Sequence, residues 1–113
     1  MDVPRIDATV VGGVGEFLRA AALVSGHGRE VCTHVHPEVH VHLAMAIGNL
    51  HRAGLEVMLP DLGLDVLHRL IERPLELRGG EAVAPDLPGL GLRPDWEAVE
   101  AHRVDGDARR SGA

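Results

Sequence analysis

Four histidines and one glutamate crowd into a short stretch of this sequence: His34, His36, Glu38, His40 and His42. Imidazole and carboxylate groups together suit a zinc, iron or manganese ion. On a single strand the four histidines would share one face, because side chains alternate along a strand. Pro37, however, is favoured in the first turn of a helix. On a helix His40 turns away from Glu38 and His42. We therefore expect Glu38 and His42 to cap and pack this helix and not to bind a metal ion.

Two other features suggest chemistry less strongly. Gly12 and Gly13 end an apolar run before a helix-like segment, a setting in which backbone N–H groups can bind phosphate. The rest of a dinucleotide-binding pattern is missing. Cys32 lies inside an apolar run, so we expect a buried, small hydrophobic side chain.

Composition excludes several classes of function. The chain has 113 residues, a net charge of −6 and mean hydropathy of +0.04. An acidic chain is poorly suited to nucleic acid or an anionic membrane, so neither is expected as a partner. All 11 basic residues are arginines, which excludes lysine chemistry. A single cysteine excludes an internal disulfide.

No apolar run reaches the roughly 18 residues of a membrane span, and the N-terminus does not look like a signal peptide. We therefore expect a cytoplasmic protein.

Strand and helix patterns alternate three times in the first two thirds of the chain. The predicted strands cover residues 5–11, 30–34 and 54–58, and the predicted helices cover residues 16–24, 37–48 and 64–71. Such alternation is typical of α/β proteins with a parallel sheet.

The pattern changes after Pro74. A Gly-Gly turn at 79–80 between residues 75–78 and 81–84 predicts a β-hairpin. Residues 85–91 are rich in turn formers, residues 95–103 predict a terminal helix, and residues 105–113 have the composition of a disordered tail.

Four stretches, in this order, resemble the C-terminal part of the enolase superfamily, and most closely its mandelate racemase / muconate lactonizing enzyme group. They are DATVVGG at 7–13 with EFLRAAA at 16–22, THVHPE at 33–38 with HL at 42–43, LEV at 55–57, and PDLPGLGL at 85–92. The resemblance implies the last three β/α units of a TIM-type (β/α) barrel in residues 1–73. It also implies that the hairpin, loop and helix of residues 74–104 return to a capping domain.

The resemblance to the mandelate racemase-like branch also implies roles for three residues. His34 matches a base at the end of the seventh strand, and Asp7 matches the acid that hydrogen-bonds this base. Glu56 matches a glutamate that contacts the substrate carboxylate, and its apolar surroundings predict a raised pKa. Without the family, Asp7 would be a turn residue, His34 a packed histidine and Glu56 a solvent-facing side chain.

The family's Mg²⁺ is held by carboxylates on strands that have no counterpart here, so the resemblance assigns no metal ligand to this chain. It implies a racemase or dehydratase that removes the α-proton of a small hydroxy-acid or sugar-acid carboxylate. We expect the chain alone to be inactive, and to pair with a second copy or with the rest of a barrel. The alternatives are a small metal-binding protein that uses residues 34–42, and a non-catalytic remnant or interaction domain.

Overall fold

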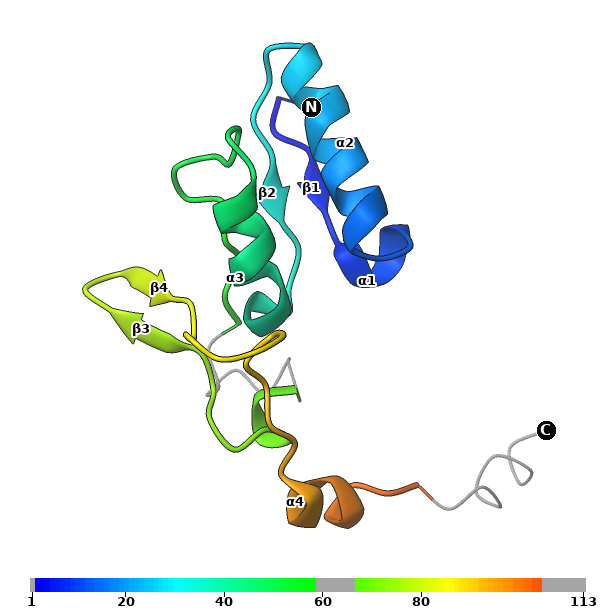
Figure 1. Cartoon of the computed structure of the whole chain (residues 1–113), viewed down its shortest axis with the longest axis vertical. Helices are drawn as coiled ribbons and strands as arrows, with labels where there is room; N and C mark the ends of the chain where they lie inside the picture. Colours follow the sequence, from blue (N-terminus) through cyan, green and yellow to red (C-terminus); the bar gives the residue numbers. More distant parts are fainter. Residues whose placement is uncertain (1, 59–66, 105–113) are drawn as a thin grey trace, which may run out of the picture.

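The computed structural model describes residues 2–58 and 67–104, so the predicted tail lies outside the described part. Figure 1 shows helices packed beside two short strands in the first half of the chain, with a hairpin and a small helix beyond them. The elements are β1 Arg5–Ile6, α1 Ala8–Val11, α2 Val14–Gly26, β2 Cys32–Thr33, α3 Pro37–Ala46, the 3₁₀ helix η2 Leu67–Arg69, β3 Glu76–Arg78, β4 Glu81–Val83 and α4 Trp96–Ala101.

Strands β1 and β2 pair in parallel, as the alternating pattern predicts. Ile6 lies opposite Thr33 in the ladder, and the N–H of His34 donates to the carbonyl of Ile6 over 3.1 Å. The chain crosses from one strand to the other through α2. The residues that follow each strand therefore meet at the same edge of this small sheet.

The predicted strand over 5–11 is wrong beyond Ile6, because residues 8–11 form the helix α1. Asp7 is its N-cap and accepts a hydrogen bond from the N–H of Thr9 over 2.8 Å. This cap outweighs the β propensity of the following residues. The helix ends at Gly12, whose φ of 108° suits glycine, and the N–H groups of Gly12 and Gly13 both bond to Ala8. Because both N–H groups are used at the helix end, they form no phosphate cradle.

The predicted third strand over 54–58 is also wrong, since residues 54–58 form no strand. The chain does run beside β2, through a parallel bridge between Val31 and Leu50 and a bond from the N–H of Thr33 to the carbonyl of Gly54. The N–H of Glu56 then bonds to the hydroxyl of Thr33 over 3.2 Å, in place of a backbone carbonyl. This side-chain bond ends the ladder.

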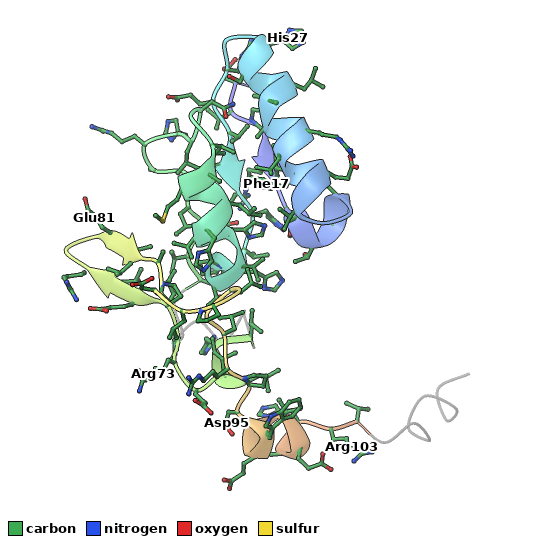
Figure 2. All side chains as sticks on the ribbon, viewed as in Figure 1. Phe17, His27, Arg73, Glu81, Asp95 and Arg103 are labelled. Carbon is green, nitrogen blue, oxygen red and sulfur yellow. The ribbon has the colours of Figure 1, made fainter. Side chains whose placement is uncertain are left out.

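Helices α2 and α3 cover the strands and contact each other. Their shared core is mostly aliphatic, as the composition predicts: Ile6, Ala8, Phe17, Ala21, Val31 and Leu43. Phe17 is fully buried at its centre, between α2 and α3 (Figure 2). Other apolar side chains remain uncovered, including Leu23 at 67% and Met45 at 73% exposed.

The second half of the chain follows the prediction in its hairpin and its last helix. Strands β3 and β4 pair antiparallel, and both turn glycines, Gly79 and Gly80, have positive φ. Asp95 caps α4. The predicted helix over 64–71 falls partly outside the described residues; its described part is the 3₁₀ helix η2, followed by an antiparallel bridge between Ile71 and Pro94.

Candidate active site

The Asp7 carboxylate and the His34 imidazole meet at the C-terminal edge of β1 and β2. His34 Nδ1 lies 3.0 Å from Asp7 Oδ2, which is the hydrogen bond expected for this pair. An ionised carboxylate only accepts hydrogen bonds, so Nδ1 carries the proton. In the neutral ring Nε2 then keeps a free lone pair. The Asp7 side chain is 8% exposed and that of His34 46%. The pair thus combines a buried carboxylate with a partly exposed imidazole.

Asp7 is held as an anion by its neighbours. Its Oδ1 accepts hydrogen bonds from the N–H and the hydroxyl of Thr9 over 2.8 and 2.7 Å. Burial raises the pKa of the Asp7 carboxyl, but the bonds from His34 and Thr9 outweigh it and leave this pKa below its ordinary value. Asp7 therefore stays ionised at neutral pH and fixes the orientation of the ring.

Glu56 lies beside this pair but faces the protein. Its Oε2 accepts a hydrogen bond from the N–H of Val35 over 2.9 Å, and its Oε1 forms an ion pair with Arg5. Burial raises the pKa of Glu56, but the bonds from Val35 and Arg5 outweigh it, so the pKa is lowered. The raised pKa predicted from the apolar neighbours is wrong, because the sequence does not show that Arg5 and the Val35 N–H converge on the carboxylate.

The sequence and the fold match a known family. A family model described as "Enolase C-terminal domain-like" matches residues 1–99. The chain belongs to this enolase family. Its relatives include proteins of the mandelate racemase type and sugar-acid dehydratases, so the predicted resemblance is confirmed.

Three relatives show how much of an enolase-type protein this chain represents. It is 37% identical over 80% of its length to the L-talarate/galactarate dehydratase of Salmonella typhimurium. The L-talarate dehydratase of Polaromonas sp. JS666, solved with Mg and L-glucarate, superposes with a TM-score of 0.73 at 31% identity over 91% of this chain. A mandelate racemase/muconate lactonizing enzyme from Polaromonas sp. JS666 superposes with a TM-score of 0.68 at 30% identity over 88%. The chain spans only 21%, 26% and 25% of these proteins, respectively.

The metal site in residues 34–42, which the sequence left open as an alternative, is not formed in the described part of the chain. His40 is fully buried in the core, and His42 Nε2 instead bonds to the carbonyl of Leu90 over 3.1 Å. Within residues 2–58 and 67–104, no three His, Cys, Asp or Glu side chains are placed to hold a metal ion. Helix formation from Pro37 separates the histidines, so the metal-binding alternative is not supported.

Cys32 also differs from its prediction, because it is only half-buried in β2 and not fully buried. Burial raises the pKa of its thiol, and the nearby Glu56 carboxylate adds to this effect. A protonated thiol is a poor nucleophile, so Cys32 has no assigned chemistry here.

The sequence did not predict two features of this candidate site. His40 lies directly behind the pair, with its Nε2 3.5 Å from Asp7 Oδ1. Val35 and His36, which follow His34, have positive φ values of 40° and 43°. Neither is a glycine, so no local signal in the sequence marks this turn. These positive φ values show that the backbone between His34 and α3 is strained. In the described part of the chain, no helix is long and apolar enough to cross a membrane.

Proposed function

We propose that this chain supplies the proton-abstracting half of a racemase or dehydratase active site of the enolase family, with His34 as general base and Asp7 as the residue that orients it. The observation that carries the proposal is the hydrogen bond from His34 Nδ1 to Asp7 Oδ2. In the neutral ring this bond places the free lone pair on Nε2, and the His34 side chain is 46% exposed. A base must present a free lone pair at an accessible position.

The chemistry of the pair is removal of a proton from carbon. Nε2 of His34 would take the α-proton of a carboxylate substrate, and the electron pair of the broken C–H bond would move into the substrate as an enediolate. The ring would then be an imidazolium, whose charge the Asp7 carboxylate stabilises at 3.0 Å. A positioned general base contributes typically about 10²–10⁴-fold to the rate.

Glu56 is proposed as the third site residue, facing the substrate carboxylate. Donation to that carboxylate would require a protonated Glu56, whereas the lowered pKa keeps it ionised and bound to Arg5 and Val35. In the free chain Glu56 therefore supports the turn after His34. Contact with substrate would require Glu56 to gain a proton and leave Arg5.

The proposed substrate class is a small hydroxy acid or sugar acid. Supporting relatives are the L-talarate/galactarate dehydratase of Salmonella typhimurium and the Polaromonas L-talarate dehydratase solved with L-glucarate. Several solved relatives also hold Mg. The described residues of this chain do not form a site for that ion, so no step through Mg²⁺ is assigned to them.

We further propose that the 113-residue chain alone has no turnover, and that it acts only beside a second copy or the remaining part of a barrel. It covers 21% of the Salmonella dehydratase, and exposed apolar side chains such as Val10, Leu23 and Met45 leave surface for such pairing. Forming an enediolate requires stabilisation of the developing negative charge. A base and its orienting acid do not supply that stabilisation.

A chimeric enzyme tests the proposed role of His34. Residues 1–99 would replace the matching segment of the Salmonella dehydratase, and exchange of the galactarate α-proton with deuterium from solvent would be followed by NMR. Exchange that falls by at least about 10²-fold in His34→Asn supports the base assignment. His42→Asn, on the same stretch but bonded to Leu90, is the matched control. Equal exchange in the parent chimera and His34→Asn would refute the assignment.

A further inference from the structure

We propose that His40 is a positioning residue for the Asp7–His34 pair: one buried imidazole that binds the backbone next to both of them. The N–H of Ala8, which follows Asp7, donates to His40 Nε2 over 2.9 Å. His40 Nδ1 donates to the carbonyl of Val35, which follows His34, over 2.7 Å. The catalytic relevance of His40 rests on the proposed function, whereas its two hydrogen bonds do not depend on that function.

These two bonds define the state of the His40 ring. A backbone N–H can only donate, so Nε2 accepts and carries no proton. A carbonyl oxygen can only accept, so Nδ1 carries the proton, and it also lies 3.1 Å from the carbonyl of His36. The 3.5 Å from Nε2 to Asp7 Oδ1 is beyond a good hydrogen bond. His40 therefore hydrogen-bonds to the backbone beside Asp7, and not to its carboxylate.

The His40 ring has little freedom to move. It is fully buried, and its centroid lies 5.9 Å from that of Phe17, which is also fully buried. Phe17 belongs to α2 and His40 to α3, so packing of the two helices fixes the ring. A ring that is held in place by packing also restrains the positions of the groups to which it is hydrogen-bonded.

The carbonyl bond matters because the turn after His34 is strained. Val35 and His36 both have positive φ, and such residues persist only where their surroundings hold them. Glu56 binds the N–H of Val35 and His40 binds its carbonyl. Val35 is thus held on both sides, and the strand end that carries His34 is fixed relative to Asp7.

Two substitutions separate the two halves of this bridge. His40→Gln places an amide near the position of Nε2 and can still accept from Ala8, but it loses the bond to Val35. His40→Asn places its amide near Nδ1 and can still donate to Val35, but it loses the bond to Ala8. In the full 113-residue chain we expect amide hydrogen exchange at Ala8 to be at least tenfold faster in His40→Asn than in His40→Gln.

The second readout is the tautomer of His34, from long-range ¹H–¹⁵N NMR spectra above the pH at which histidines titrate. In His40→Gln, which frees the Val35 carbonyl, we expect His34 to lose its single Nδ1–H form and to become a mixture. Val31→Ala is the matched control, because Val31 is a fully buried residue of the same core and takes no part in the bonds of His40 or in its contact with Phe17. We expect it to leave the His34 tautomer unchanged. A purely structural role for His40 would instead shift the tautomer in Val31→Ala as well, or in neither variant.

The wild-type chain alone can also overturn the inference, should the variants fail to fold. Its spectrum must show His40 as the Nδ1–H tautomer with an unprotonated Nε2. A protonated Nε2 on His40, or equal Ala8 exchange in the two His40 variants, contradicts the bridge. None of these readouts involves turnover. If α-proton exchange in the chimera does not depend on His34, the proposed base is refuted, but the hydrogen bonds of His40 to Ala8 and Val35 are not.

Discussion

His34 Nδ1 lies 3.0 Å from Asp7 Oδ2, although 27 positions separate the two residues in the chain. The parallel pairing of β1 with β2 produces this contact, because each residue directly follows one of the two strands. Asp7 has a second function as the N-cap of α1. One carboxylate thus ends a strand, begins a helix and orients the proposed base.

Acid should destabilise the chain through Asp7 and Glu56. The folded-state pKa of each is lowered from ordinary values of 3.8 and 4.5. A carboxyl with a lowered pKa contributes stability above its unfolded value, and this stability is lost as pH falls through the folded value. We expect the free energy of unfolding to fall below about pH 5.

Urea denaturation between pH 3 and 7 measures this effect. The Asp7→Asn, Glu56→Gln double variant should lose less stability over this range than the wild type. Asp86→Asn, at an exposed position, is the control and should behave as the wild type. Identical pH profiles for the wild type and the double variant would show that these carboxylates do not carry the acid sensitivity.

Relief of backbone strain should set Val35 apart from other valines. A non-glycine residue at positive φ costs about 1–3 kcal/mol, which glycine avoids. Val35→Gly should therefore leave the free energy of unfolding at or above the wild-type value. The same change at Val39, inside α3, should lower it by about 1 kcal/mol or more. If chemical denaturation shows equal losses at both positions, the turn at Val35 is not strained.

The isolated 113-residue chain should neither turn over acid substrates nor bind magnesium better than a generic acidic protein. The reason is that its described residues offer no three-ligand metal group beside the Asp7–His34 pair. Deuterium exchange at the α-carbon of hydroxy acids, with and without magnesium, measures this. Magnesium-dependent exchange that disappears in His34→Asn would instead show an active self-assembled form.

The sequence predicted those parts of the fold that depend on strong local signals. Three local signals were each sufficient to place an element: the run of helix-forming residues before Gly26, Pro37 at a helix start, and the Gly-Gly turn at 79–80. Residues 8–11 were mistaken for a strand because β propensity competes there with the cap of Asp7. The third strand was mistaken because the Thr33 hydroxyl replaces a backbone partner, a tertiary contact that no local pattern reveals.

The same distinction between local signals and tertiary contacts applies to the residues of the candidate site. Asp7 and His34 were predicted together from their family motif, and the structure shows their hydrogen bond. The predicted direction of the Glu56 pKa shift was wrong because this pKa depends on the N–H of Val35 and on Arg5, which are 21 and 51 positions away in the chain. The sequence placed His40 on a helix face away from Glu38 and His42 and gave it no role in the site, because a sequence does not show that its partners are the backbone of Ala8 and Val35.

The long-range ¹H–¹⁵N NMR spectrum of the 113-residue chain shows directly whether Asp7 holds His34 with a free Nε2. At a pH where the histidines are neutral, we expect one His34 form, with Nδ1 protonated and Nε2 unprotonated. In Asp7→Asn the amide can donate as well as accept, and this preference should be lost. A wild-type spectrum in which His34 carries its proton on Nε2, or one that Asp7→Asn leaves unchanged, would show that Asp7 does not orient His34.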